Sequence, residues 1–143
     1  MWKDGIITTD EGEVIARPGM TADEVRSTRF ALGGKFWQNP ESVRHQHIQE
    51  APFRIRDNNC IGHAYFLDGR LVFFGFILSQ EEAKLRFGTT QPGPDSEELK
   101  FYQAWVEQEV GSRPPVNFPW GRIGADYNYK TMSCDIYLKY SHT

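Results

Sequence analysis

The stretch from Arg54 to Ser79 constrains the fold of this chain more than any other. Two apolar runs flank Asp68-Gly69, a dipeptide that tolerates the positive φ angles of a two-residue type I′ turn, so the stretch is predicted to form a tight β-hairpin. Register follows from the length of the turn, and two uninterrupted strands pair Tyr65 with Val72. This hairpin is expected to be the centre of the sheet.

The period of two along each strand sorts the side chains of the hairpin into two faces, and neither face is polar. The first face carries Cys60, Gly62, Ala64, Phe66, Leu71, Phe73 and Ile77, and the second carries Ile61, His63, Tyr65, Leu67, Val72, Phe74, Phe76 and Leu78. A sheet that is apolar on both sides has to be covered on both sides, by helices, by a second layer or by another chain.

Length and charge indicate how many domains the chain forms and which kinds of partner it is unsuited to bind. The 143 residues are enough for one domain, residues 1–143, with a substantial core. The net charge is −3 and the 16 lysine and arginine residues are scattered rather than striped, which argues against binding to nucleic acid. No apolar run approaches the roughly 18 residues of a membrane span, and the start lacks a signal-peptide pattern. With two widely separated cysteines and no CxxC motif, the sequence predicts a cytoplasmic protein with reduced thiols.

Two principal helices are predicted from their end signals. Thr21 and Glu24 have the spacing of a capping box and begin a helix expected over Ala22 to Ala31. Asp95 is the expected N-cap of the second helix, whose body ends at Val110 before a glycine. The stripe of this helix that should lie on the sheet consists of Leu99, Tyr102, Val106 and Val110.

The other strands are less regular. Ile6 to Ala16 is expected to form a small hairpin, and Phe53 with Ile55 indicates a strand before the main hairpin. Residues 35–50 show neither period clearly and are treated as a loop. After the hairpin, the capping-box spacing of Ser79 and Glu82 favours a short helix, although a continued strand fits as well.

Phe118 to Tyr140 is predicted to be a second hairpin. Its last strand alternates between a buried set and a wet set, which places that strand near a sheet edge or on a side of the sheet that faces solvent. The buried set is Cys134, Ile136, Leu138 and Tyr140. Altogether the sequence predicts an α+β fold, with a mainly antiparallel sheet of about five to seven strands and two principal helices packed on it.

One cluster is a candidate for metal chemistry. His45 and His47 are separated by one residue, so on a strand they point the same way, and Glu50 is near enough to complete a metal site. Across the second hairpin, Asp126 and Asp135 are expected to face each other as surface charges. No phosphate loop, nucleophile elbow or HExxH motif is present, and no cofactor is predicted.

Binding to another protein accounts for more features of the sequence than metal binding or catalysis does. Tyr, Trp and Phe dominate interface energetics, and several aromatic side chains have no obvious slot in the core. The candidate partner-binding residues are Phe101, Trp105, Trp120, Asp126, Tyr127 and Tyr129. Phe101 and Trp105 lie on the far flank of the second helix, so they are either covered by another segment or exposed as an aromatic patch. Acidic residues near them suit a basic partner.

Two motifs carry a resemblance to known proteins. Trp120 to Tyr140 (WGRIGADYNYKTMSCDIYLKY) and Pro18 to Val25 (PGMTADEV) resemble small bacterial cytoplasmic proteins of the kind that includes the immunity proteins of toxin systems. The second motif is followed by a helix and then a strand. This order also resembles that of small modules in which a helix leads into a curved antiparallel sheet and the face of the sheet binds protein. The first resemblance implies a stoichiometric inhibitor that occludes the active site of a toxin and has no catalysis of its own.

The predicted function is therefore a protein-binding module of the immunity or inhibitor type, acting on a partner such as a basic toxin domain. One alternative is a small metal-binding or enzymatic domain that uses His45, His47 and Glu50. Another is a homodimer whose interface is the apolar second face of the sheet.

Overall fold

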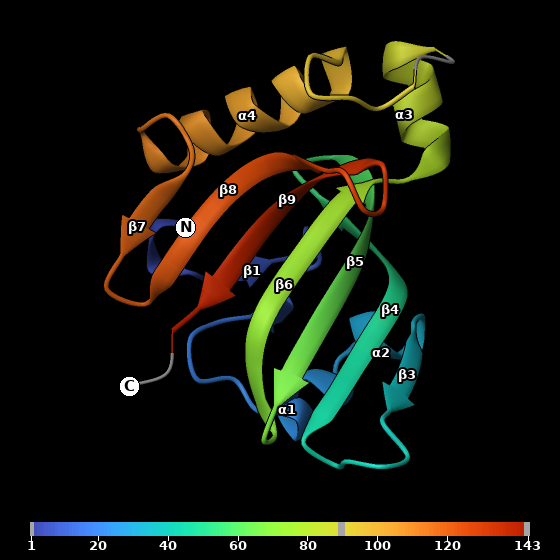
Figure 1. Ribbon diagram of the computed structural model, residues 1–143, viewed down its shortest axis with the longest axis vertical. Coiled ribbons are helices and arrows are strands. Elements are labelled where there is room, and N and C mark those ends of the chain that lie inside the picture. Colours follow the sequence, from blue (N-terminus) through green and yellow to red (C-terminus); the bar gives the residue numbers. More distant parts are fainter. Residues whose placement is uncertain (1, 89–90, 142–143) are drawn as a thin grey trace.

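The computed structural model describes residues 2–88 and 91–141 and is an α+β fold built on a curved seven-stranded antiparallel sheet (Figure 1). In sheet order the strands are β3 (Lys35–Gln38), β4 (His45–Ile55), β5 (Asn58–Leu67), β6 (Arg70–Leu78), β9 (Ser133–Tyr140), β8 (Gly121–Asn128) and β7 (Val116–Phe118). A separate two-stranded sheet pairs β1 (Ile7–Thr8) with β2 (Val14–Ala16). The predicted fold class, the central hairpin and the N-terminal hairpin are confirmed.

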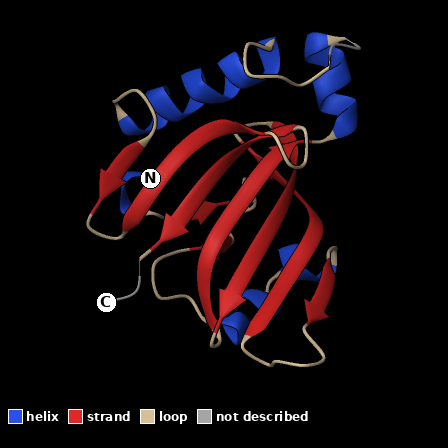
Figure 2. Ribbon diagram, in the orientation of Figure 1, coloured by secondary structure: helices blue, strands red, loops and turns tan. Residues whose placement is uncertain are grey.

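Helices cover one face of the large sheet. They are the 3₁₀ turn η1 (Trp2–Asp4), α1 (Ala22–Arg26), α2 (Arg29–Leu32), α3 (Gln80–Phe87) and α4 (Glu97–Val110). In Figure 2, α1 and α2 lie behind the strands and α3 and α4 lie above them, and within the described ranges no helix crosses the near face. None of these described helices is long and apolar enough to span a membrane.

The core lies between these helices and the sheet. Helix α4 is fastened at its centre by Tyr102, whose hydroxyl accepts a hydrogen bond from the Leu78 amide (2.9 Å) and donates one to Glu98 (2.6 Å). The predicted stripe of α4 is buried as expected. The buried apolar side chains of β5, β6, β8 and β9 pack against the helices in one core. The helix-covered face is therefore the packed face of the sheet.

A β-bulge corrects the predicted register of the central hairpin. Phe66 pairs with Leu71 as expected, but Tyr65 pairs with Phe73, which leaves Val72 as an extra residue. A bulged residue reverses the alternation of the strand beyond it. Phe74, Phe76 and Leu78 therefore join the packed face, and Phe73 and Ile77 lie on the other face, opposite to the prediction. Within the described chain, helices cover only one face of the sheet. Of the predicted coverings of the second face, another chain stays a prediction.

Residues 35–50 are not a loop but contain β3 and the first half of β4. Strand β3 is an edge strand with all four residues exposed, so it has no apolar alternation to detect. In β4 the pairing shifts between Ile48 and Ala51, and Glu50 has a positive φ of 54°. This irregularity breaks the period of two within the segment.

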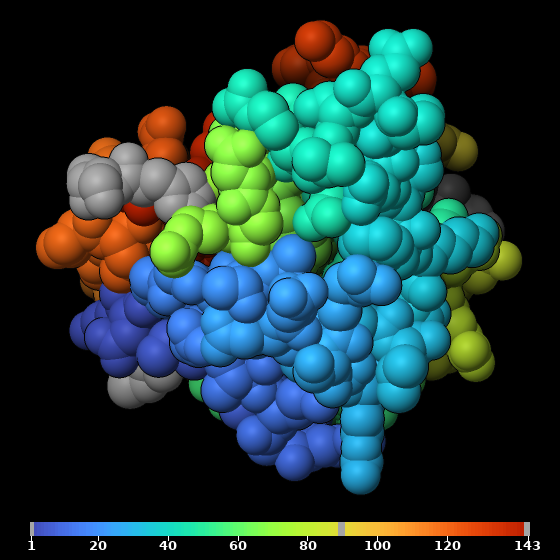
Figure 3. Space-filling view, turned by 90° about the horizontal axis from the view of Figure 1, so that it is seen from below, coloured from blue at the N-terminus to red at the C-terminus, as the bar shows by residue number. Residues whose placement is uncertain are grey.

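The first predicted helix is two short helices. The capping box at Thr21 and Glu24 is present, but α1 ends at Arg26, and Thr28 caps α2 by accepting a hydrogen bond from the Ala31 amide (3.1 Å). A threonine hydroxyl that bonds to nearby backbone competes with the helical ladder, which explains the break. Figure 3 shows this blue segment against the green turn of the central hairpin, where the Ala22 amide donates to Gly69 (2.8 Å).

One further boundary differs from prediction. Ser96, not Asp95, is the N-cap of α4 and accepts from the Leu99 amide (3.2 Å). Of the two positions predicted for the last strand, the solvent-facing side is correct, because β9 lies between β6 and β8 and its wet side belongs to the uncovered face of the sheet. Its buried set is as predicted. Of the two alternatives after Ser79, the helix is correct.

Candidate functional site: the open face of the sheet

The face of the sheet without helices, called here the open face, carries a row of aromatic rings across four strands. Trp37, His47, Tyr65 and Phe73 are successive register partners on β3, β4, β5 and β6. Their ring centroids are 4.6, 5.3 and 5.5 Å apart in that order. Trp37 is 42% exposed and Tyr65 is 37% exposed. This aromatic row is a continuous, half-buried apolar surface.

Tyr137 of β9 extends the aromatic surface toward the other end of the sheet. Its ring lies parallel to that of Phe73, with centroids 6.2 Å apart. Both register partners of Tyr137 are glycines, Gly75 on β6 and Gly124 on β8. A Cβ atom at Gly124 would come within 2.5 Å of the Tyr137 hydroxyl, and one at Gly75 within 2.8 Å of the Phe73 ring. The two glycines thus let the rings lie flat over the backbone.

Charged residues flank Tyr137 on the same two strands. On one side Arg122 pairs with Lys139, and on the other Asp126 pairs with Asp135, as predicted. Within the described residues neither carboxylate forms an ion pair. The open face therefore has a cationic end and an anionic end, separated by a tyrosine.

Asp135 has an unusual environment. Burial, followed by the negative charge of Asp126, raises its pKa to about 6, although Lys139 opposes the change. A hollow of about 320 Å³ adjoins these groups. It is lined by Phe73, Asp126, Tyr127, Asn128, Tyr129, Asp135, Tyr137 and Lys139.

Replacing Asp135 by asparagine is expected to stabilise the protein at pH 7.5 and to change little at pH 4. A carboxyl group whose pKa is raised on folding costs no stability below its unfolded pKa and costs progressively more as the pH rises through the folded pKa. The gain at pH 7.5 is expected to be about 1–2 kcal/mol, because solvent screens part of the charge. Urea unfolding at the two pH values measures it, with Asp57→Asn as an exposed control. An equal effect of Asp135→Asn at both pH values would contradict this assignment.

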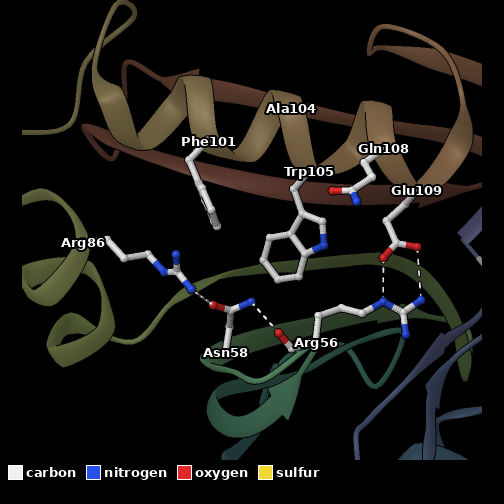
Figure 4. A pocket seen from close by; sticks show the side chains of 8 residues that line it. All are labelled: Arg56, Asn58, Arg86, Phe101, Ala104, Trp105, Gln108 and Glu109. Atoms are coloured by element: carbon white, nitrogen blue, oxygen red, sulfur yellow. Dashed lines mark hydrogen bonds and ion pairs between the residues drawn. The ribbon is translucent and has the colours of Figure 1, made fainter.

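A second hollow, of about 510 Å³, lies between α4, α3 and the β4–β5 turn (Figure 4). Arg56 forms two hydrogen bonds with Glu109, at 2.7 and 3.1 Å. Arg86 bonds to Asn58 and lies 4.9 Å from the centre of the Phe101 ring. Both guanidinium groups already have partners, so the charged side chains around this hollow connect α3, α4 and the β4–β5 turn to one another.

The structure separates the six predicted binding residues into two groups. Trp105 has a core slot, contrary to expectation: it is 7% exposed, and its ring lies 5.4 Å from Trp2 and 5.9 Å from Phe76. Phe101 is half-buried against Phe87 of α3. The segments that cover this flank are therefore η1 and α3.

The other predicted residues lie nearer the C-terminal hairpin. The Trp120 indole donates to the Lys3 carbonyl oxygen (2.6 Å) and stacks on Phe118, so it fastens the N-terminus to the sheet. Asp126, Tyr127 and Tyr129 gather at the end of β8 beside the open face. Tyr129 is 74% exposed, and its ring lies 4.8 Å from that of Tyr127. Of the three, Asp126 lies on the open face, whereas Tyr127 pairs with Cys134 and packs against the core, and Tyr129 follows the end of β8. Their role in binding stays a prediction.

The prediction missed the aromatic row itself. The signal was present in part: His45, His47 and the alternating residues of β5 share a face once β4 is recognised as a strand. The bulge at Val72 puts Phe73 on the open face, whereas the uninterrupted strand pattern predicts the opposite face.

The proposed metal ligands do not converge. Among residues 2–88 and 91–141, no three histidine, cysteine, aspartate or glutamate side chains are grouped to hold a metal ion. The His47 ring stacks on Trp37, and burial lowers its pKa. Glu50 instead pairs with Lys35 at 2.8 Å. His47 and Glu50 therefore make contacts with neighbouring side chains on the sheet instead of sharing a metal site.

Both cysteines are buried and free of disulfide. Burial raises the pKa of Cys60 to about 12, which leaves its thiol protonated at neutral pH. The structure gives neither cysteine the environment of a reactive thiolate.

Comparison with known proteins identifies a similar fold. No protein-family model matches the sequence, and no curated protein matches it. Among solved structures, this chain is similar to a chain of the complex described as "Rhs1-CT in complex with cognate immunity protein RhsI1". The TM-score is 0.54 at 15% sequence identity, covering 92% of this chain and 86% of that chain. At this identity the likeness shows a fold shared with a chain of a toxin–immunity complex, which agrees with the resemblance predicted from the sequence.

Proposed function

We propose that this protein is an immunity-type inhibitor that binds a toxin domain through the open face and has no catalytic activity of its own. The observation that carries the proposal is the aromatic row, which crosses four strands of a sheet that the described helices leave uncovered. Aromatic side chains supply much of the binding energy at protein interfaces.

The fold likeness supports the same function. The solved complex contains a cognate immunity protein, and the likeness extends over 92% of this chain. We place the inhibitor in the bacterial cytoplasm, which suits its two free cysteines. A partner with basic groups suits the corner at Asp126 and Asp135, since neither carboxylate is paired within the described chain.

An enzyme of the predicted type has less support. The metal alternative required His45, His47 and Glu50 to converge, and Glu50 is paired with Lys35 instead. The hollow beside α4 is bounded by arginine side chains that are already bonded to Glu109 and Asn58. A binding surface is therefore the function that the geometry supports best.

Capture and growth protection test the proposal together. The tagged protein is used to capture its partner from a lysate of its source, with a high-salt wash, and the captured protein is then expressed alone and with the inhibitor. We expect a one-to-one partner that arrests growth by itself and is neutralised by coexpression.

The variant that isolates the open face is Tyr65→Asp. It is expected to stay folded, because Tyr65 is 37% exposed, and to weaken binding by about 30-fold or more, in the range of an interface hot spot. Leu85→Asp on α3 is the matched control, since Leu85 is 80% exposed away from the aromatic row. A captured partner that is harmless alone, or a Tyr65→Asp variant that protects as well as wild type, would overturn the proposal.

A further inference from the structure

We infer that two copies of this chain pack open face to open face in a symmetric dimer. The dimer does not depend on the proposed function, but the same face would then serve both, so a partner that binds it has to displace the second copy. The side chains of the open face are arranged in rows that complement one another.

The aromatic row continues into positive charge. Phe73 pairs with Lys139 of β9, and Lys139 pairs with Arg122 of β8. Both cationic residues are exposed. This first row is thus aromatic over β3 to β6 and cationic over β9 and β8.

A second row, called here the aliphatic row, has the complementary character. Pro52, Ile61 and Ile77 are successive register partners on β4, β5 and β6. Gly75 pairs with Tyr137, so Ile77, two residues later, lies level with Asp135, two residues earlier on the antiparallel strand. Asp135 in turn pairs with Asp126. This row is aliphatic over β4 to β6 and anionic over β9 and β8.

Between the two rows lies a line of small and flat groups. It runs through His63, Gly75, Tyr137 and Gly124, which are successive register partners. Each outer row is two residues from this line, about 7 Å along the strands. A two-fold axis along the line, in the plane between two facing sheets, exchanges one outer row with the other.

This rotation matches unlike groups on the same strand. Phe73 of one copy meets Ile77 of the other, and Tyr65 meets Ile61. Lys139 meets Asp135, and Arg122 meets Asp126. The interface is therefore isologous, with apolar contacts at its centre and opposite charges at one side. The carboxylates that lack an ion pair within the described chain gain one across the axis.

The size of the face sets the strength of the dimer. Facing sheets lie about 10 Å apart with their strands at about −30°, so contact is greatest over the central strands β5, β6 and β9. Five strands at about 4.8 Å spacing and five residues at about 3.3 Å give a footprint of about 400 Å² per copy. Standard interfaces bury about 800 Å² per partner. The dimer is therefore expected to be weak and displaceable.

A charge-swap experiment tests the symmetric pairing. Sedimentation equilibrium, over a concentration series from micromolar to near-millimolar, is expected to show the wild type passing from the 16.5 kDa of one chain toward twice that mass. Lys139→Asp alone and Asp135→Lys alone are each expected to weaken the dimer about tenfold to a hundredfold, because each places like charges across the axis. An equimolar mixture restores both attractive pairs, and the dissociation constant should return to within about threefold of wild type.

The exposed pair Arg122→Asp and Asp126→Arg provides a second test that does not disturb the half-buried Asp135. Leu85→Asp is the inert control. A wild type that stays at 16.5 kDa throughout would overturn the dimer. A dimer that is indifferent to the swaps, or single variants that do not recover on mixing, would overturn this interface. Neither result bears on the capture of a toxin partner, so failure of the dimer is distinguishable from failure of the proposed function.

Discussion

Replacing Trp105 by alanine is expected to destabilise the protein by about 3–5 kcal/mol, a large share of the stability of a domain of this size. The indole lies in the core between Trp2 and Phe76 and also contacts Phe101. Its loss leaves a cavity at the point where η1, α4 and the sheet meet, which the surrounding backbone can fill only in part.

Urea unfolding followed by far-UV circular dichroism measures the effect of Trp105→Ala. The control is Leu85→Ala, which removes a side chain that is 80% exposed and is expected to change stability by less than about 0.5 kcal/mol. A Trp105→Ala variant that keeps wild-type stability and loses only partner binding would show that Trp105 is a contact residue, as the sequence had suggested.

Replacing Gly121 by alanine is expected to cost about 3 kcal/mol or more. Gly121 has a φ of 149°, and a Cβ atom there would come within 1.9 Å of the Lys139 carbonyl oxygen, which is backbone and has no side-chain freedom to move away. The substitution forces β8 and β9 apart where their pairing begins. Because the cationic end of the open face lies there, Arg122 and Lys139 should also lose their arrangement.

Thermal and urea unfolding measure the effect of Gly121→Ala, with Gly93→Ala as the control, since no atom lies within 4 Å of a Cβ at Gly93. The control is expected to be close to wild type. Equal stability of the two variants would mean that the close approach of β8 to β9 is absent in solution.

Local signals predicted the parts of the fold that depend on local chemistry. The Asp68-Gly69 turn, the capping box at Thr21 and the left-handed glycine at Gly111 were all recognised, because turn and cap geometry select particular residue types. The sheet order could not be predicted in this way. The contact of β6 with β9 joins residues far apart in the sequence, and no local preference specifies it.

The open face was harder to predict than the fold, for two physical reasons. The bulge at Val72 moved Phe73 to the open face, and a single inserted residue has no signature in the period of a strand. Trp105 looked superfluous on its helix because the side chain that packs against it, Trp2, lies in a short N-terminal turn that the pattern did not indicate. Aromatic residues outside a helical stripe are therefore weak evidence for a binding surface.

Side-chain footprinting tests most directly whether the open face binds another protein. Hydroxyl-radical oxidation of the free protein is compared with that of its complex with the captured partner, at a concentration where the free protein is monomeric. We predict that oxidation of Trp37, Tyr65 and Phe73 falls on binding while that of Leu85 is unchanged. Unchanged oxidation of the aromatic row, with protection of Leu85 and Phe101 instead, would contradict the claim and move the binding site to α3 and α4.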